Sequence, residues 1–269
     1  PVYSGERPVC GGAGCLRDMK TIIGSRIDTS IDTGSLLVPI NSLSHYIQRF
    51  SDPGLYHAHG LKEYQLSKSG SLARVAHKGR YFALTSHHQS KLADYDYDEL
   101  VVTNRERSRY YSGHRAVFPI EVGENEYSFD CLVYEFTDLV RSGRIPSDVW
   151  YQIPEESRGY STPKPIIICT VGYPSYRNHI DYESSSYPIG PNAVWGFEKE
   201  PRIVGRLSFS PISPIDFEPS GMSGSPVFAV RMEGTLLKLF LAGILTEASR
   251  TAFNFLPLNR IIPALNSIA

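Results

Sequence analysis

A serine flanked by glycines is the part of the chain whose residue types best suit covalent chemistry. Ser223 lies in Gly221-Met-Ser-Gly-Ser-Pro226, just ahead of an apolar run. A serine hydroxyl becomes a useful nucleophile when a base takes its proton and nearby donors stabilise the oxyanion formed in the substrate. Because glycine lacks a Cβ, Gly221 can turn its amide inward beside that of Ser223, and Gly224 lets a substrate approach closely. We therefore expect an oxyanion hole formed by the amides of Gly221 and Ser223, although such residues are also ordinary loop material.

The expected base is a histidine, and two adjacent histidines follow a strand-like run. His87 and His88 lie in Leu84-Thr-Ser-His-His-Gln89. Here the sequence resembles the chymotrypsin-fold (trypsin-like) serine peptidases, whose base lies in a Leu-Thr-Ala-x-His motif. Matching Leu84-Thr85 to that motif makes His88 the base. The alternatives are His87, or two solvent-facing histidines at a strand end.

An aspartate must hold the imidazole in the correct tautomer. The family places it before an apolar run, and Asp130 in Phe129-Asp-Cys-Leu-Val-Tyr134 fits that pattern. The alternatives, Asp96 and Asp98, lie in a charged stretch that favours a solvated loop. The order His88, Asp130, Ser223 is the chain order of this family and differs from that of subtilisins and α/β-hydrolases.

Three further stretches look like bacterial members of the family. They are Gly70-Ser-Leu-Ala-Arg74, Val171-Gly-Tyr-Pro174 and Leu241-Ala-Gly-Ile244, so the likeness covers about residues 66–265. In the family, the strand after the serine lines the substrate pocket and pairs with the substrate backbone. The resemblance thus implies these substrate-binding residues: Phe217, Ala242, Gly243, Leu245 and Glu247.

Departures from the family pattern bear on specificity and control. Phe217 stands where trypsin-like enzymes carry a specificity aspartate, although Asp216, Glu218 or Glu247 can still face a basic side chain. Leu245 replaces the histidine of glutamate-specific relatives. Met222 replaces the aspartate that captures a new N-terminal ammonium in zymogen-type members, and methionine cannot accept that charge. Gln89 replaces a disulfide cysteine of the animal enzymes.

Two other patterns suggest different chemistry. Ile31-Asp-Thr-Gly-Ser35 is the signature of aspartic peptidases, but they need a second such motif and the chain has none, so we expect a polar turn between short strands. The acidic stretch Asp96-Tyr-Asp-Glu99 lacks the regular oxygen spacing of a calcium loop. Cys10 and Cys15 are close enough to bridge or to share a metal, but we predict no metal site.

Composition excludes several classes of partner. The net charge is -1, from 27 basic and 28 acidic residues without a long basic block, so we expect no nucleic-acid partner. No apolar stretch reaches the roughly 20 residues that span a bilayer, so we expect no membrane association. Four scattered cysteines favour a reducing compartment and hence a cytoplasmic protein, and the resemblance implies a bacterial one. A chain that starts at Pro1 without a leader is expected to be a processed piece.

The spacing of apolar runs predicts an all-β fold, and the resemblance implies two six-stranded β-barrels. Residues 1–65 are expected to form a regulatory or docking N-terminal extension, and residues 66–269 the peptidase domain. We expect a helix over 41–50 capped by Asn41, loops over 173–201, a hairpin turn over 231–234, and a helix over 258–265 that Pro263 must start or break. The expected strands cover residues 71–77, 80–85, 100–103, 116–122, 129–136, 166–172, 203–209, 226–230 and 236–245.

The sequence thus predicts a serine endopeptidase that acts on few protein targets under regulation. Acylation and hydrolysis by a serine triad need no metal or cofactor. The expected partners are a protein or peptide substrate and an activating protein or additional domains. The alternative function is a catalytically silent or partner-gated binding module on the same fold.

Overall fold

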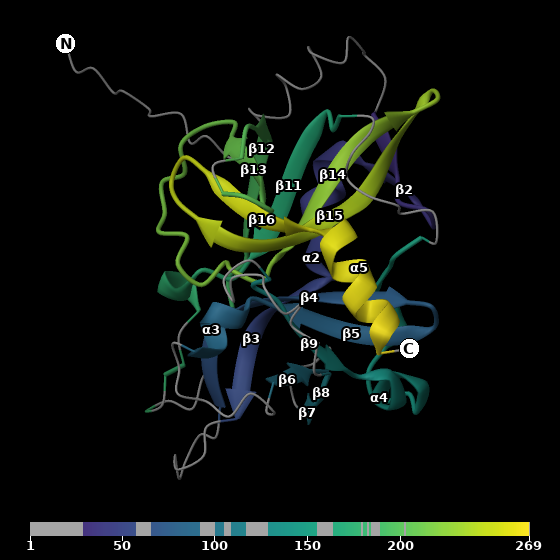
Figure 1. Ribbon diagram of the computed structural model, residues 1–269, viewed down its shortest axis with the longest axis vertical. Coiled ribbons are helices and arrows are strands. Elements are labelled where there is room, and N and C mark those ends of the chain that lie inside the picture. The colour runs from purple at the N-terminus through teal and green to yellow at the C-terminus, as the bar shows by residue number, and fades with distance from the viewer. Residues whose placement is uncertain are drawn as a thin grey trace, which may run out of the picture.

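The computed structural model describes residues 29–57, 66–91, 100–104, 109–116, 129–154, 164–178, 180–181, 183, 189–201 and 203–268. The described residues are mostly β-strands, arranged as two curled sheets that lie one above the other in Figure 1. Both sheets are antiparallel except where β10 joins β4 and β1 joins β15. The all-β prediction is confirmed.

The sheet formed by the C-terminal half closes into a barrel. Its strand order is β14-β11-β12-β13-β16-β15, and pairing of β14 with β15 closes the six-stranded ring. A short antiparallel pair, β1 and β2, continues this sheet beyond β15. The bounds are β11 (Ile167–Gly172), β12 (Asn192–Lys199), β13 (Leu207–Pro211), β14 (Pro226–Glu233), β15 (Leu236–Ala248), β16 (Phe253–Pro257), β1 (Ser30–Asp32) and β2 (Leu37–Pro39).

The other sheet is a curled half-barrel over the described residues, so the expected second closed ring is not seen there. Its order is β7-β6-β3-β4-β5-β9-β8, with β10 beside β4. The bounds are β3 (Ser51–His57), β4 (Leu66–His77), β5 (Arg80–Thr85), β6 (Leu100–Thr103), β7 (Tyr110–Ser112), β8 (His114–Ala116), β9 (Leu132–Glu135) and β10 (Tyr151–Gln152). β3 lies within residues 1–65, so the folded body begins before residue 66. The docking or regulatory role of residues 1–65 stays a prediction.

Short helices connect and cover the strands. They are α2 (Leu43–Gln48), α3 (His87–Lys91), α4 (Thr137–Arg141) and α5 (Leu258–Ser267), with 3-10 turns η1 (Ile40–Ser42), η2 (Ser147–Val149) and η3 (Ser175–Arg177). The helix expected over 41–50 is confirmed as α2, but Asn41 is not its cap. It lies inside η1, and the residue before α2 is Ser42, whose side chain makes no capping bond.

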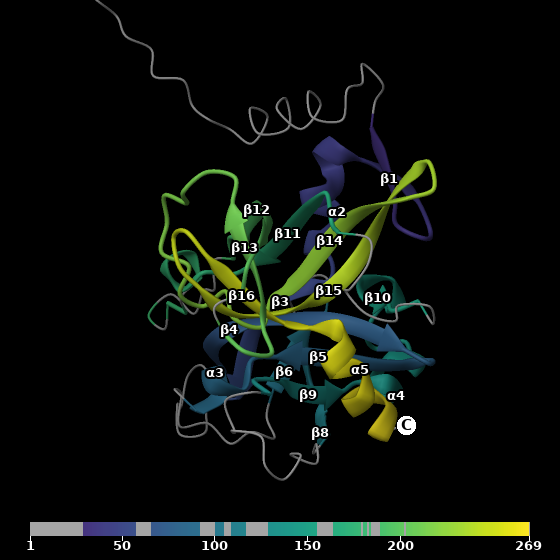
Figure 2. The ribbon, with the colours of Figure 1, turned by 45° about the horizontal axis from the view of Figure 1, so that its top comes forward.

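α5 crosses from the closed barrel to the half-barrel, as Figure 2 shows. Leu258, Ile261 and Leu265 bury one face of it. Pro263 lies in its second turn without ending it, which corrects our expectation. Proline there removes one helical hydrogen bond, and burial of the apolar face offsets that loss. Beyond the proline, Asn266 Oδ1 lies 3.0 Å from Nε2 of His77 in β4.

One hydrophobic core joins the two sheets and fixes their relative position. Its buried residues include Val75 and Leu84 from the half-barrel and Phe228 and Ile244 from the closed barrel. Tyr173 donates a hydrogen bond to the carbonyl oxygen of Ser51, 3.0 Å away, from one sheet to the other. Residues contributed by both sheets can therefore form one site.

Some element boundaries differ from the sequence predictions. β12 lies inside the expected loop segment 173–201, where Val194 and Gly196 are buried on alternate positions. The strand expected over 203–209 starts only at Leu207, because Gly205 takes a turn conformation with φ +77°. The predicted hairpin is confirmed, with Gly234 at φ +61° between β14 and β15. The strand expected over 116–122 lies almost wholly outside the described residues.

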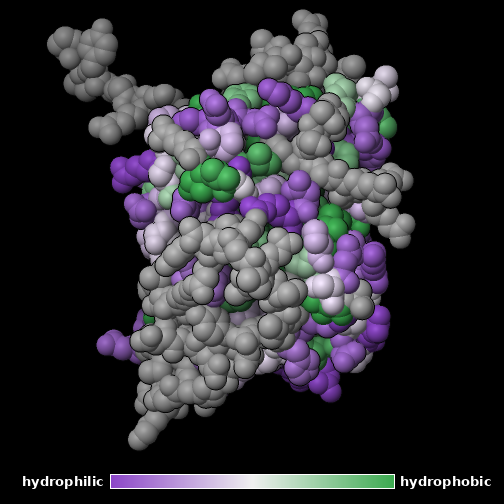
Figure 3. Space-filling view, in the orientation of Figure 1, coloured by the Kyte–Doolittle hydropathy of each residue, from purple (hydrophilic) through white to green (hydrophobic). Residues whose placement is uncertain are grey.

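Among the described residues on the face shown in Figure 3, hydrophobic residues form small groups among hydrophilic ones. Of the large hydrophobic residues that the structure describes, Val204 is the most exposed, at 96%. Among the described helices, none is long and apolar enough to cross a membrane.

Candidate active site

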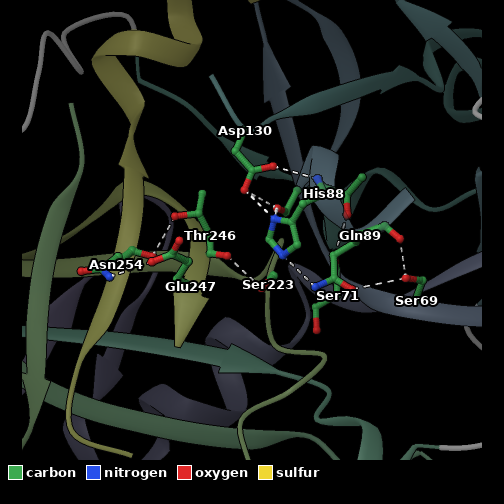
Figure 4. A network of polar contacts seen from close by, with 11 residues as sticks. Ser69, Ser71, His88, Gln89, Asp130, Ser223, Thr246, Glu247 and Asn254 are labelled. Carbon is green, nitrogen blue, oxygen red and sulfur yellow. Dashed lines mark hydrogen bonds and ion pairs between the residues drawn. The ribbon is translucent and has the colours of Figure 1, made fainter. Parts of the chain in front are cut away.

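Two neighbouring strands of the half-barrel bring His88 and Asp130 together. His88 lies in α3 immediately after β5, and Asp130 precedes β9, which pairs with β5 through Thr85 and Leu132. The ring Nδ1 of His88 lies 2.7 Å from Oδ2 of Asp130. The backbone amide of His88 also donates to Oδ1 of Asp130 at 2.9 Å (Figure 4). This pairing favours the tautomer that carries its proton on Nδ1 and leaves Nε2 as the basic atom.

A buried serine adds a third donor to Asp130. Ser86 Oγ donates to Oδ2 of Asp130 at 2.7 Å, and Ser86 is fully buried. Burial alone would raise the pKa of Asp130, but the hydrogen bonds from His88 and Ser86 outweigh it and hold the pKa below its usual range. We did not predict this role for Ser86, although its hydroxyl at the alanine position of the family motif was a usable signal.

The expected nucleophile lies in a tight loop that two glycines make possible. Gly221 and Gly224 adopt φ +89° and +90°, conformations that other residues rarely take. Between them, Met222 is fully buried and anchors the loop in the core of the closed barrel. The amides of Gly221 and Ser223 donate to no acceptor among the described residues. The oxyanion hole that we expect from these two amides stays a prediction.

Backbone hydrogen bonds hold this loop between the two sheets. On the β15 side, Gly224 N donates to Leu245 O at 2.7 Å, and Leu245 N donates to Ser225 O at 2.8 Å. On the β4 side, Ser71 N donates to Ser223 O at 2.8 Å. Ser71 Oγ also donates to the carbonyl oxygen of Gly221 at 2.8 Å. The loop is therefore rigid in its backbone.

The hydroxyl of Ser223 does not bond to His88 in this structure. Ser223 Oγ donates to the carbonyl oxygen of Thr246 at 3.0 Å, and the residue is only 8% exposed. The side-chain nitrogen of Gln89 instead lies 3.0 Å from Nε2 of His88 (Figure 4). His88 and Asp130 are thus assembled, whereas the serine hydroxyl points to the neighbouring strand.

Gln89 is held in place by its surroundings. Ser69 Oγ donates to the carbonyl oxygen of Gln89 at 2.7 Å and lies 3.3 Å from its Oε1. A Cβ placed on Gly70 would lie 2.9 Å from Cγ of Gln89, so the absence of a side chain at Gly70 makes room for it. The sequence marked Gln89 only as a missing cysteine, because a contact with the adjacent histidine depends on side-chain rotamers.

The residues expected to bind substrate have different surroundings. Ala242 and Leu245 are buried in the core, and both backbone groups of Leu245 bond the nucleophile loop. Gly243 packs so closely on the carbonyl of Leu256 that its role is also in packing. The side chains of Ala242 and Leu245 and the backbone at Gly243 are therefore packed inside the barrel next to the nucleophile loop, and they form no exposed surface.

Phe217 and Glu247 remain accessible. The Phe217 ring stacks on Tyr176, with centroids 5.9 Å apart. Glu247 is exposed, accepts a hydrogen bond from the Asn254 side chain at 3.2 Å, and borders a cavity of about 200 Å³. Lys199 and Ser208 line the same cavity. The substrate contacts expected of Phe217 and Glu247 stay a prediction.

The other motifs of the sequence lie apart from this site. Asp32 Oδ1 accepts the amide of Gly34 at 2.8 Å in the turn between β1 and β2, which confirms the predicted polar turn. The acidic stretch 96–99, Cys10 and Cys15 lie outside the described residues. Cys131 and Cys169 are buried, which raises the pKa of both thiols. Within the described ranges no cluster of three metal-binding side chains occurs.

Comparison with known proteins supports the fold. No family model matches the chain, and no curated protein sequence matches it. Among solved structures, it is similar to a mutant of human heparin binding protein, with a TM-score of 0.53 and 11% sequence identity over 83% of this chain and 92% of that chain. The fold is thus the chymotrypsin fold, as we predicted. At this identity the likeness shows the fold alone.

Proposed function

We propose that this protein is a serine endopeptidase with Ser223 as nucleophile, His88 as general base and Asp130 as the group that orients the base. The observation that carries the proposal is the His88–Asp130 pair at 2.7 Å, next to a serine loop with two free amides. Buried Ser86 and Asp130 form a hydrogen-bonded network with His88, whose side chain is 37% exposed. That network fits the orientation of a catalytic imidazole.

The reaction begins with a rotation of two side chains. Gln89 must leave Nε2 of His88, and Ser223 must turn its hydroxyl from the Thr246 carbonyl toward that nitrogen. Rotamer changes of this kind need no movement of the backbone. The amides of Gly221 and Ser223 keep their positions throughout.

Catalysis then follows from the positions of the groups. His88 Nε2 takes the proton as Ser223 Oγ bonds to the substrate carbonyl carbon, and the amides of Gly221 and Ser223 hold the oxyanion. His88 next gives its proton to the leaving nitrogen as the peptide bond breaks, which leaves an acyl-enzyme. Water, deprotonated by His88, hydrolyses the ester and restores the Ser223 hydroxyl. Asp130 stays ionised and stabilises the imidazolium.

We further propose that the activity is gated. The observed Ser223 and Gln89 contacts describe a resting site, and Met222 is buried and apolar, so activation by capture of a new N-terminus is unsupported. Binding of a protein substrate or of an activating partner supplies the energy to turn Gln89 aside. We propose, further, that the peptidase acts on few protein targets and that it works in a cytoplasmic, bacterial setting.

A fluorophosphonate probe tests the proposal, because it reacts covalently with an activated serine. We expect labelling of the wild-type protein that is lost in Ser223→Ala and His88→Ala. Ser220→Ala, an exposed serine of the same loop, is the matched control and should keep its labelling. Labelling that persists in Ser223→Ala would contradict the assignment.

The second candidate is a binding module on the same fold. It is favoured by one observation, the Ser223 hydroxyl that bonds Thr246 rather than His88. A protein that resists the probe with and without peptides, yet stays folded, would support this alternative.

A further inference from the structure

A partly buried lysine lies beside the expected oxyanion hole. Lys68 belongs to β4, and its Nζ donates to the carbonyl oxygen of Tyr173 at 2.6 Å and lies 3.5 Å from Ser175 Oγ. A Cβ placed on Gly221 would lie 2.7 Å from this Nζ and would collide with Ser175 Oγ. The ammonium thus lies against the glycine that contributes one of the two free amides.

No acidic side chain of the described residues pairs with Lys68. Its only described polar neighbours are the Tyr173 carbonyl and the Ser175 hydroxyl, both neutral. Burial lowers the pKa of Lys68 to about 8, so the ammonium is mostly charged at neutral pH. A partly buried charge without a counter-ion is costly to keep. Its position next to the reacting centre indicates that a ligand supplies the missing negative charge.

The contacts of the nucleophile loop, together with the substrate pairing along β15 that the resemblance implies, indicate on which side of the scissile bond this charge lies. The nucleophile loop is bonded on one side to β15 at Leu245 and on the other to β4 at Ser71. A substrate that pairs with the end of β15 through the residues before the scissile bond must leave the loop toward β4. The residues that follow the scissile bond therefore approach Lys68, three positions before Ser71 in the same strand.

We propose that Lys68 determines specificity by binding an acidic side chain, aspartate or glutamate, directly after the scissile bond. This inference rests on the proposed peptidase function. One ammonium hydrogen remains for the carboxylate while the other two face the Tyr173 carbonyl and the Ser175 hydroxyl. Such charge-assisted bonds are the stronger class of hydrogen bond. A peptide that lacks the carboxylate loses this bond and is therefore cleaved less efficiently. Lys68 is a specificity residue in this account, and the bond-breaking steps do not require it.

The test uses a peptide that the wild-type protein cleaves, made in three versions with Glu, Gln or Lys after the scissile bond. We expect kcat/KM for the Glu peptide to exceed that for the Gln peptide about tenfold, as one charged hydrogen bond can contribute. Lys68→Met should make the Glu and Gln peptides equal while hydrolysis continues. Lys68→Glu should prefer the Lys peptide. Lys238→Met, in the β14–β15 hairpin, is the matched control and should keep the wild-type preference.

The outcomes separate this inference from the function on which it rests. Equal cleavage of the three peptides by the wild-type protein overturns the role of Lys68 and leaves the peptidase intact. A uniform loss of rate with all three peptides in Lys68→Met also overturns it, because the lysine then stabilises the oxyanion instead. A wild-type protein that cleaves no peptide and resists the fluorophosphonate probe overturns the peptidase itself.

Discussion

The side-chain nitrogen of Gln89 lies 3.0 Å from Nε2 of His88, the nitrogen that receives the proton of Ser223 in the proposed reaction. Ser223 in turn donates to Thr246 O, on the neighbouring strand. Gln89 thus occupies Nε2 of His88, and Thr246 accepts the hydroxyl of Ser223, so the two groups that react with each other in the proposed mechanism both have other partners. The resting site is therefore blocked by two hydrogen bonds rather than by a missing residue.

Removal of the Gln89 side chain should increase reactivity. Gln89→Ala frees Nε2 of His88, and loss of one net hydrogen bond should raise the rate of fluorophosphonate labelling about two- to tenfold. Gln152→Ala, an exposed glutamine of β10, is the control and should leave the rate unchanged. A slower rate in Gln89→Ala would show that Gln89 supports the imidazole rather than blocks it.

A larger residue at Gly221 should disrupt the site for two reasons, the positive φ angle of the backbone and the lack of space for a side chain. Gly221→Ala must strain a backbone at φ +89° and collide with Ser175 and Lys68, so labelling should fall about 100-fold or more as the oxyanion hole distorts. Gly34→Ala separates the two causes, because Gly34 has φ +86° and open space around it. It should cost about 1–3 kcal/mol of stability and leave labelling intact. Equal labelling of the two variants would contradict the assignment of Gly221.

Lys68 should lower the stability of the fold in a pH-dependent way. Its pKa falls to about 8 in the folded protein from 10.5 unfolded, so below pH 8 it is charged in both states and the full burial cost applies. Between pH 8 and pH 10.5 Lys68 is mostly neutral in the folded protein but still protonated in the unfolded chain, so the free energy of unfolding rises with pH. Lys68→Met should thus gain about 1–2 kcal/mol at pH 7, allowing for partial exposure. In urea unfolding, this gain should shrink toward pH 10.5; a gain that grows with pH would refute the assignment.

Ionised Asp130 should stabilise the fold, whereas charged Lys68 destabilises it, although stability rises with pH in both cases. The pKa of Asp130 lies below the usual range in the folded protein, so its hydrogen bonds contribute stability above the unfolded pKa, near pH 4. That contribution is lost as the pH falls through the lower, folded pKa. Asp130→Asn should be less stable than wild type at pH 7, and the difference measured by urea unfolding should narrow below pH 4. A constant difference would mean that ionisation of Asp130 does not matter.

The parts of the site that depend on residue type and order were predictable from the sequence. The glycines around Ser223 indicated a backbone geometry that needs glycine, and the apolar run after Asp130 predicted strand β9. The run before His88 anticipated strand β5 in the same way. These features are local, since each depends on a few neighbouring residues and on strand periodicity.

The remaining features depend on contacts between distant segments. The Gln89 contact with His88 and the bond from Ser223 to Thr246 are choices of rotamer made inside the packed site. The position of Lys68 beside Gly221 requires β4 and the nucleophile loop to meet across the two sheets. β12 was missed because Pro and Gly in the preceding segment resemble a continuous loop. The prediction for Pro263 was wrong because the buried apolar face keeps α5 helical although the proline removes one of its hydrogen bonds.

Cleavage of a diverse peptide library measures most directly whether Ser223 and His88 hydrolyse peptide bonds, as we propose. Mass spectrometry of the new peptide ends should reveal internal cleavages by the wild-type protein, at a rate that Gln89→Ala increases. Ser223→Ala and His88→Ala should both lose these cleavages while they keep the folded circular dichroism spectrum. Undiminished cleavage by purified Ser223→Ala, or none by any folded variant including Gln89→Ala, would contradict the account.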